Sequence, residues 1–268
     1  MTDAMVAADA PVLLRASGLR KSFGGVHAVQ DISLGVAAGA VFAVIGPNGA
    51  GKSTLLNLLS GVFRPDAGRV TFDGADLTRV AAHRRVRHGI ARTFQKIRLF
   101  AHLSALDNVV AGFHIHTTVP AWQYVIHGPA FRANHARCRA EAARLLAFMG
   151  LEARASVVAG SLSYGERRML EIARALATAP RLLMVDEPAA GLNAQEVERL
   201  VERLQTLRRD GLTILVVEHN MDLVMTIADR VLVIDYGQHL FEGPPAEVQQ
   251  HPGVIAAYLG DEAPNVKP

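Results

Sequence analysis

The chain has 268 residues, of which 50% are hydrophobic, and a formal net charge of +3. This size and composition exclude a disordered chain and allow one large or two small hydrophobic cores. The apolar runs are short, as at residues 212–217, and none approaches the ~18 residues needed to cross a bilayer. Residues 1–11 carry Asp3 and Asp9 and no basic stretch before an apolar one, so we expect no secretory signal and a cytosolic protein.

The first part of the chain, residues 12–74, consists of short apolar runs separated by turn residues. Such runs favour a small antiparallel sheet packed against the rest of the core. We predict strands at residues 13–19, 29–34, 41–45 and 70–72, with turns at residues 66–68 and 73–74.

A phosphate-binding pattern, G-x-x-x-x-G-K-[ST], follows the strand at residues 41–45 and precedes an apolar helical segment at residues 55–59. The match consists of Gly46, Pro47, Asn48, Gly49, Ala50, Gly51, Lys52, Ser53 and Thr54. A strand, a glycine-rich turn and a helix start aim backbone N–H groups and the positive end of a helix at one point, which suits a polyphosphate. The sequence therefore predicts a nucleoside triphosphate site, in which Lys52 reaches the β- and γ-phosphates and Ser53 ligates Mg²⁺.

From residue 81 to about residue 150 the pattern is mostly helical and predicts a separate lobe. The lobe is predicted to end in a helix at about residues 136–149, with Gly150 as its C-terminal stop. Residues 114–130 contain prolines and aromatics without a clean period, so we expect an irregular insertion. Cys138, the only cysteine, has the helical spacing of a core residue, with a reactive thiol as the alternative.

A cluster of arginines follows residue 80 and is compatible with a nucleic-acid-binding surface. It lacks interleaved aromatic residues, and charges elsewhere are mixed in sign, so a solvated helix face is the favoured interpretation. The cluster consists of Arg84, Arg85, Arg87, Arg92 and Arg98.

From residue 161 onward, helical and strand patterns alternate, which predicts a parallel sheet covered by helices and an α/β fold. Asn193, with Glu196 three residues later, is predicted to cap the second helix. The predicted helices span residues 164–178, 194–209 and 221–228, and the predicted strands span residues 181–186, 213–217 and 230–234.

An acidic pair, Asp186 and Glu187, ends the apolar strand at residues 181–186. Strand ends of this kind face the phosphate site in an open α/β sheet. We expect Asp186 to hold Mg²⁺, partly through water, and Glu187 to act as base for an attacking water. The alternative is that the two carboxylates cap the next helix.

Between these motifs stand Leu162, Ser163, Tyr164, Gly165 and Glu166, followed by a helix. Here the chain resembles the ATP-binding subunits of ABC transporters, whose signature reads LSGGQ, with Tyr164 in place of the first glycine and Glu166 in place of the glutamine. The resemblance implies that the signature of one subunit contacts the γ-phosphate held by its partner's phosphate loop. ATP hydrolysis would then need a head-to-tail dimer.

Other positions match this family one at a time. Phe23 matches the aromatic that stacks on adenine, although an ordinary apolar residue at a strand end is the alternative. Gln95 matches the glutamine that approaches Mg²⁺ and the attacking water, and His219 matches the histidine that contacts the γ-phosphate. Asn193 stands where the family usually has Asp in a dimer-contact loop.

The resemblance covers about residues 12–260 and implies a single ABC ATPase domain with an N-terminal antiparallel β-subdomain and a helical lobe. The β-subdomain and phosphate loop would take residues 12–80 and the helical lobe residues 81–160. The second half of the core would take residues 161–240 and a C-terminal tail residues 241–268.

A narrower resemblance points to the G-type ATP-binding subunit of bacterial branched-chain amino-acid importers. It rests on residues 93–100, 114–130, 187–193, 218–221 and 252–260. It implies ATP and Mg²⁺ as ligands and a peripheral position on the cytoplasmic face of the inner membrane. The implied partners are a second ATP-binding subunit, two membrane-spanning permease subunits and, indirectly, a periplasmic binding protein.

Three alternatives stay open. A urea or short-amide importer, or the ATPase of lipopolysaccharide export, would share most of these motifs. A soluble ABC ATPase acting on nucleic acid would belong to another class, but it typically carries coiled coils, zinc motifs or a second ATPase core. A regulatory nucleotide-binding module without turnover would not need both Glu187 and His219.

Overall fold

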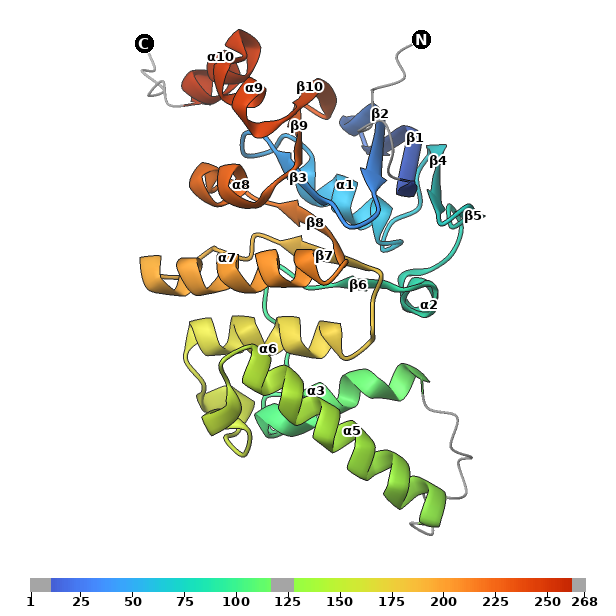
Figure 1. Cartoon of the computed structure of the whole chain (residues 1–268). Helices are drawn as coiled ribbons and strands as arrows, with labels where there is room; N and C mark the ends of the chain where they lie inside the picture. Colours follow the sequence, from blue (N-terminus) through green and yellow to red (C-terminus); the bar gives the residue numbers. More distant parts are fainter. Residues whose placement is uncertain (1–10, 117–127, 262–268) are drawn as a thin grey trace.

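The computed structural model describes residues 11–116 and 128–261, which form two β-sheets, the helices that pack on them and a helical lobe (Figure 1). The central sheet has six strands in the order β10-β9-β3-β8-β7-β6. Its strands are β3 (Val41–Ile45), β6 (Ile90–Arg92), β7 (Leu182–Asp186), β8 (Thr213–Val217), β9 (Arg230–Asp235) and β10 (Gln238–Gly243). All neighbours pair in parallel except β10, which runs antiparallel to β9.

A second, antiparallel sheet has the order β2-β1-β4-β5. It consists of β1 (Val12–Phe23), β2 (Val26–Ala37), β4 (Ala67–Phe72) and β5 (Ala75–Asp76). Helix α1 (Lys52–Leu59) lies between the two sheets (Figure 1), and its leucines join Leu14 and Phe72 of the second sheet and Phe42 of the central sheet in one hydrophobic cluster. The β-subdomain is therefore fastened to the core through the helix that follows the phosphate loop.

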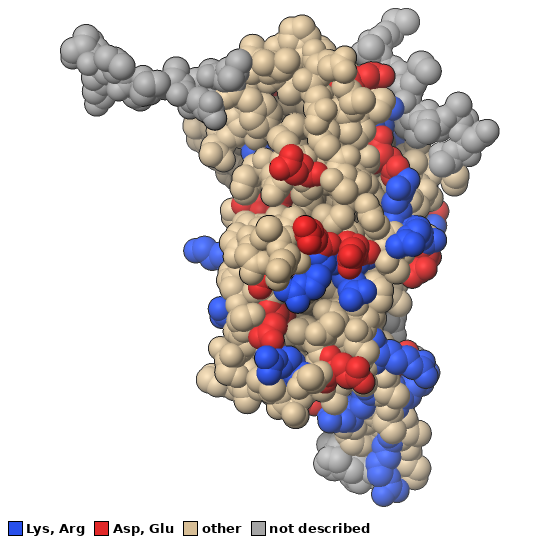
Figure 2. Space-filling view, turned by 60° about the vertical axis from the view of Figure 1, so that its left-hand side comes forward, with Lys and Arg blue, Asp and Glu red and all other residues tan. Residues whose placement is uncertain are grey.

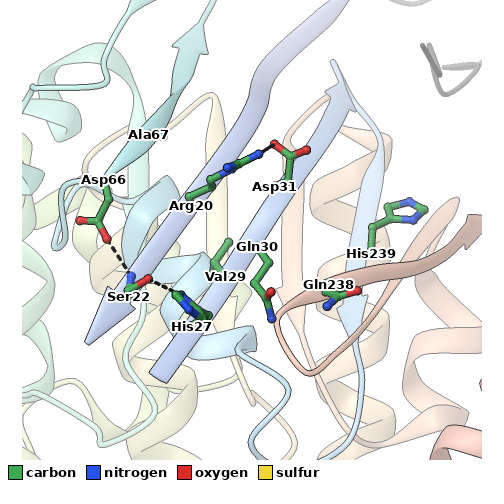
Figure 3. Close-up of a pocket in the computed structure, with 10 residues that line it drawn as sticks. All are labelled: Arg20, Ser22, His27, Val29, Gln30, Asp31, Asp66, Ala67, Gln238 and His239. Atoms are coloured by element: carbon green, nitrogen blue, oxygen red, sulfur yellow. Dashed lines mark hydrogen bonds and ion pairs between the residues drawn. The ribbon is translucent and has the colours of Figure 1, made fainter. Parts of the chain in front are cut away.

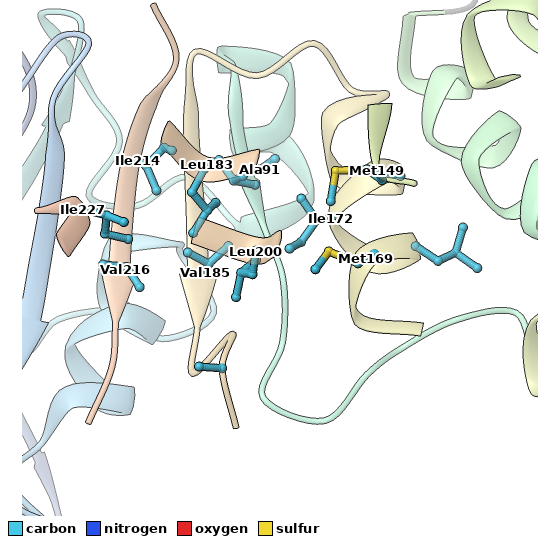
Figure 4. Packing of buried hydrophobic residues seen from close by; sticks show 14 of the residues in the cluster. Ala91, Met149, Met169, Ile172, Leu183, Val185, Leu200, Ile214, Val216 and Ile227 are labelled. Atoms are coloured by element: carbon cyan, nitrogen blue, oxygen red, sulfur yellow. The ribbon is translucent and has the colours of Figure 1, made fainter. Parts of the chain in front are cut away.

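The opposite face of the central sheet is covered by α6 (Tyr164–Leu176), α7 (Ala194–Arg209) and α8 (Met221–Ile227). Figure 4 shows Val185 and Ile214 of the sheet on the same side as Leu200 of α7 and Ile172 of α6. All four side chains are fully buried. This continuous core fixes the position of α6, whose first turn is the LSGGQ-like segment.

The helical lobe consists of α3 (Ala105–Gly112), α5 (Pro129–Phe148) and α6, which contact one another at the lower end of Figure 1. The remaining helices are α2 (Ala82–Arg85), η1 (Val86–His88), η2 (Phe113–His116), η3 (Glu152–Arg154), η4 (Ala159–Ser161), α9 (Pro245–Gln250) and α10 (Pro252–Asp261). Among the described residues, no helix is long and apolar enough to span a membrane.

The predicted α/β fold with an antiparallel subdomain and a helical lobe is confirmed, but one strand was assigned to the wrong sheet. Strand β3 was grouped with the antiparallel strands and instead lies in the centre of the parallel sheet, between β9 and β8. All five of its residues are buried, which is the pattern of a strand covered on both faces.

Several element boundaries also differ from the prediction. Strands β1 and β2 extend well beyond residues 13–19 and 29–34 because register shifts let their polar ends remain paired. Strand β6 lies within the predicted lobe of residues 81–160 yet pairs with β7, so that range contains one strand of the core. The helix predicted at residues 194–209 and the strand predicted at residues 213–217 are confirmed.

The predicted insertion at residues 114–130 lies mostly outside the described residues. Its end belongs to α5, which starts at Pro129 rather than near residue 136. Proline is favourable in the first turn of a helix because its missing N–H has no partner there in any case. Cys138 is buried in the lobe core, as predicted.

The predicted solvated arginine face is wrong for two of its members. Arg85 is 1% exposed and donates hydrogen bonds to the backbone carbonyls of Leu58, Leu59, Leu77 and Val80. Burial lowers its pKa to about 10, so the guanidinium stays charged at neutral pH. Arg92 is also largely buried and pairs with Asp186, so neither side chain is available to a nucleic acid.

Candidate functional site

The phosphate loop joins β3 to α1 and depends on glycines at two close approaches. Gly46 has φ 151°, and a Cβ there would lie 2.0 Å from the Ile234 carbonyl oxygen. Gly51 has φ 98°, and a Cβ there would lie 2.2 Å from the Ala28 carbonyl oxygen. Any other residue at these positions would collide with backbone, so the loop curls tightly against β2 and β9.

Lys52 is the first residue of α1 and points back across the loop. Its Nζ donates to the carbonyl oxygens of Gly46 at 2.6 Å and Pro47 at 2.7 Å, and the residue is 6% exposed. A lysine ammonium held in place at the N-terminus of a helix is a preformed positive site for phosphate.

The carboxyl ends of β3, β7 and β8 meet at one edge of the central sheet, because these strands are parallel. An open cavity of about 550 Å³ lies there. Gly46 and Pro47 do not line it. Its lining brings together the other seven residues of the phosphate-binding pattern and two predicted catalytic residues, namely Asn48, Gly49, Ala50, Gly51, Lys52, Ser53 and Thr54 with Gln95 and Glu187.

Glu187 and Gln95 are in contact at this cavity. Gln95 Nε2 donates to Glu187 Oε2 at 3.0 Å. Glu187 has φ 45°, a conformation that is unusual for a residue other than glycine, and its N–H donates to the Val217 carbonyl at 2.8 Å. The turn at the end of β7 thus aims the carboxylate at the loop that carries Gln95 and away from the sheet.

Asp186 is 3% exposed at the end of β7. Its Oδ2 accepts from Arg92 Nη2 at 3.0 Å, whereas its Oδ1 has no hydrogen-bond partner among the described residues. Burial raises the pKa of Asp186, an effect that the Arg92 guanidinium opposes. A buried carboxylate oxygen without a partner fits a cation ligand.

A magnesium ion fits this donor set. Mg²⁺ in nucleotide sites typically takes one or two protein oxygens, with phosphates and water completing the shell. Ser53 and Asp186 supply a hydroxyl and a carboxylate. The described residues contain no group of three or more His, Cys, Asp or Glu side chains that would hold a metal without a nucleotide.

His219 follows β8 and is not part of the cavity lining. Its side chain is 57% exposed, with Nδ1 3.8 Å from Glu218 Oε2. Glu218 is fully buried and accepts backbone N–H groups from Ala189 at 2.8 Å, His219 at 2.9 Å and Asn220 at 3.0 Å. This carboxylate ties the turn after Glu187 to the turn that carries His219.

Phe23, at the end of β1, is 44% exposed and does not line the cavity. Its ring packs edge-on against Phe63 with centroids 5.3 Å apart, and Lys21 Nζ lies 5.4 Å from its centroid. An exposed aromatic face therefore remains on the β-subdomain, near the residues of β2 that do line the cavity.

The LSGGQ-like segment begins α6, and two of its own residues cap the N-terminus of that helix. Ser163 Oγ accepts from Glu166 N–H at 3.2 Å, while the Glu166 carboxylate accepts from Ser163 N–H at 2.8 Å. This reciprocal pair is a capping box, and the hydrogen bond from Ser163 is the main cause of the lowered Glu166 pKa. Leu162 is buried beneath it.

The structure does not bring this segment to the phosphate loop of its own chain, since none of residues 162–166 lines the cavity. Instead, Gly165 packs against the start of α7, where a Cβ would lie 2.2 Å from Glu196 Oε1. Asn193 caps α7 as predicted, accepting from Glu196 N–H at 3.0 Å. Its side-chain oxygen is therefore engaged within the chain.

A second hollow lies on the β-subdomain beside β10 (Figure 3). Several of its charged and polar groups already have partners within the chain. Arg20 contacts Asp31 at 3.3 Å, Asp66 accepts from Ser22 N–H at 2.7 Å, and Ser22 Oγ lies 2.8 Å from His27 Nδ1. These contacts join β1 to β2 and to Asp66, the residue before β4. The polar groups of the hollow therefore have a structural role in the subdomain.

The role of Glu218 and the bond of Arg92 to Asp186 are not among the sequence predictions. The signal for Glu218 is its position, because it is a carboxylate directly after an apolar strand. The signal for Arg92 is weaker, because its partner lies 94 positions away along the chain.

Comparisons with known proteins agree with this arrangement. The ABC transporter family model matches residues 29–190, and a model described as a branched-chain amino acid ATP-binding cassette transporter matches residues 238–264. The chain is 41% identical over 250 residues to the high-affinity branched-chain amino acid transport ATP-binding protein BraF of Pseudomonas aeruginosa, covering 93% of this chain and 98% of the relative. It is 38% identical to LivG of Escherichia coli K12 and 36% identical to the lipopolysaccharide export protein LptB of Acidithiobacillus ferridurans, each over 93% of this chain and 98% of the relative.

Solved structures show the same fold. The ADP conformation of MJ1267, an ATP-binding cassette of an ABC transporter, superimposes with a TM-score of 0.80 at 31% identity, covering 93% of this chain and 99% of that one. A nucleotide-free ATP-binding cassette superimposes with a TM-score of 0.81 at 30% identity, covering 92% and 99%.

Proposed function

The chain belongs to the ABC transporter family as an ATP-binding cassette ATPase, and on this premise we propose that it energises an importer of branched-chain amino acids. The observation that carries the catalytic part of this proposal is the contact of Gln95 with Glu187 at the cavity of the phosphate loop. It unites a phosphate-binding surface with a carboxylate that can activate water.

In this proposal the chain's own residues divide the work on ATP. The phosphate loop and Lys52 bind the phosphates, and Ser53 and Asp186 hold Mg²⁺, which neutralises charge on the β- and γ-phosphates when it is bound. Glu187 accepts a proton from the attacking water, which Gln95 helps to orient. His219 is exposed at the same edge, where it can donate to a γ-phosphate oxygen.

We propose that the LSGGQ-like segment acts on a second subunit. It is remote from its own phosphate loop, yet Ser163 and the first turn of α6 present a helix N-terminus to solvent. Such an end binds anions. A head-to-tail dimer, with a copy of this chain or with a related ATP-binding subunit, would complete each site. Two membrane-spanning subunits would complete the transporter, with the chain on the cytoplasmic face.

A groove between the core and the lobe suits a membrane subunit. It is lined by Val86, Phe100, Gly112, Ile115, Arg174 and Thr178, among others. Phe100 is 53% exposed and lies under Arg174, with the guanidinium carbon 5.7 Å from the ring centroid. Leu99, the apolar residue next to it, does not line the groove and packs against the buried core instead. Phe100 is therefore the anchor that we propose for a short cytoplasmic helix.

Replacing Phe100 by Glu is expected to abolish recovery of the chain with membranes that contain its permease subunits. Removal of an aromatic anchor from an interface typically costs about 2 kcal/mol or more, which is over tenfold in affinity. Val158→Glu is the matched control, because Val158 is an apolar residue of the lobe that is exposed to a similar extent and lies outside the groove. Equal recovery of both variants would contradict the docking groove.

Deleting the gene is expected to abolish high-affinity uptake of labelled leucine, isoleucine and valine while ATP-independent uptake persists. The cargo does not touch this subunit, so the assignment rests on the likeness to BraF and LivG. If leucine uptake is unchanged and urea or short-amide uptake disappears, the cargo assignment is wrong, whereas the ATPase role still holds.

A nucleic-acid-acting ATPase is less well supported. On the face shown in Figure 2, acidic and basic side chains are interspersed over the body of the molecule, and basic ones gather only at its lower end. A nucleic-acid surface would instead carry a continuous basic stripe.

A further inference from the structure

Helix α6 contains a buried ion pair that none of the roles above uses. Arg168 Nη1 lies 3.1 Å from Glu171 Oε2, and the two side chains are 0% and 2% exposed. Burial raises the pKa of Glu171, although the backbone N–H groups of Arg98 and Phe94 and the Arg168 charge oppose it. Replacing such a pair by well-packed apolar residues is often neutral or stabilising, so stability alone does not explain it.

The pair holds the backbone of the loop that carries Gln95. Arg168 donates from Nη1 to the Phe94 carbonyl at 2.9 Å and from Nη2 to the Gln95 carbonyl at 3.2 Å. Glu171 Oε1 accepts from the N–H groups of Phe94 at 3.4 Å and Arg98 at 3.2 Å. Helix α6 therefore binds two carbonyl groups and two amide groups of this loop.

The same arginine also reaches the LSGGQ-like segment. Arg168 Nη2 lies 3.2 Å from the Tyr164 hydroxyl, one turn earlier on α6. The Tyr164 ring in turn covers Gly191, where a Cβ would lie 3.0 Å from Tyr164 Cε1. Gly191 belongs to the turn that follows Glu187, so Tyr164 also touches the segment carrying that carboxylate.

These contacts form a closed path. It runs from Glu187 to the Gln95 side chain, from the Gln95 carbonyl to Arg168, from Arg168 to Tyr164, and from Tyr164 back to the turn after Glu187. A guanidinium can make these bonds together because its donors lie in one rigid plane.

We propose that Arg168 is a positioning residue that sets the place of Gln95 against Glu187 and couples it, through the Tyr164 hydroxyl, to the LSGGQ-like segment. The proposal rests on the roles proposed for Gln95 and Glu187. Arg168 touches neither nucleotide nor water in this scheme and acts only through the loop. Tyr164, which stands where related signatures have glycine, supplies the hydroxyl that this coupling needs.

The test uses the purified full chain and compares turnover with nucleotide affinity. Arg168→Lys keeps the charge beside Glu171 but removes the planar set of donors. We expect kcat to fall about tenfold, equivalent to ~1.4 kcal/mol of lost transition-state stabilisation, with ATP affinity within about twofold. Arg209→Lys, the same change at an exposed position late in α7, should alter neither.

A double variant separates positioning from simple destabilisation. If Arg168 acts through Gln95, Gln95→Ala with Arg168→Lys will be no slower than Gln95→Ala alone. Multiplied losses, or normal turnover in Arg168→Lys, would overturn the inference. Normal turnover in Gln95→Ala alone would instead remove the proposed role of Gln95.

Two further measurements test the same inference, and Tyr164→Phe in the otherwise unchanged chain does so even if Arg168→Lys folds poorly. Tyr164→Phe removes only a hydroxyl and is expected to lower kcat about threefold, but not further in the Arg168→Lys background. Unchanged kcat in Tyr164→Phe would contradict the proposed coupling between Arg168 and the LSGGQ-like segment. The amides of Phe94 and Arg98 should exchange hydrogen faster in Arg168→Lys, since Glu171, their acceptor, loses the guanidinium that holds its carboxylate in place. Unchanged exchange there would also count against the inference.

Discussion

Replacing Glu187 by Gln is expected to lower ATP turnover by about 10²- to 10⁴-fold, the usual contribution of a general base. The amide keeps the shape of the side chain and can still pair with Gln95, but it cannot accept a proton from water. Nucleotide binding should be unaffected, because Glu187 borders the cavity without being part of the phosphate loop. Steady-state hydrolysis and equilibrium binding of a fluorescent ATP analogue measure the two quantities.

Lys52→Ala provides the contrast to this variant. It deletes the charge that faces the β- and γ-phosphates and should weaken nucleotide binding itself. Loss of binding in Lys52→Ala together with retained binding in Glu187→Gln assigns the two residues to different steps. Near-normal turnover in Glu187→Gln would show that Glu187 is not the general base.

The parts of the site that were predictable from sequence are those whose chemistry is local. The phosphate loop is a contiguous pattern whose strand and helix are adjacent along the chain, and the cap of α7 joins two residues three positions apart. Asp186 and Glu187 were identifiable because a fully apolar strand ends on them. In each case residue order alone fixes the geometry.

The parts that were not predictable depend on contacts between distant segments. Arg92 meets Asp186 only because β6 and β7 pair, and the three residues of β6 are too few to show a period. Glu218 meets Ala189 because β7 and β8 are neighbours. Strand β3 was placed in the wrong sheet for a similar reason, since the sheet that a strand joins depends on its partners.

The exposed first turn of α6 leads to a second large expected effect. Ser163→Arg is expected to leave nucleotide binding intact and reduce hydrolysis at least ~10²-fold, as loss of one preorganised anion donor typically does. Arginine also removes the cap of α6, so two variants control for that. Ser163→Thr keeps a capping hydroxyl and should retain activity, whereas Ser163→Asp also caps well but would repel a phosphate and should be inactive.

Mixing two inactive proteins decides whether this segment serves its own chain or a partner. In a head-to-tail pair of Ser163→Arg with Glu187→Gln, one site combines an intact Glu187 with an intact Ser163 and the other has neither. Roughly a quarter of the wild-type sites should then be restored, because about half of randomly paired dimers are mixed and each has one complete site. If each chain completed its own site, every site in the mixture would lack one of the two residues. Activity that stays at the level of the separate variants, in a protein whose wild-type rate per subunit rises with concentration, would therefore contradict action across a dimer.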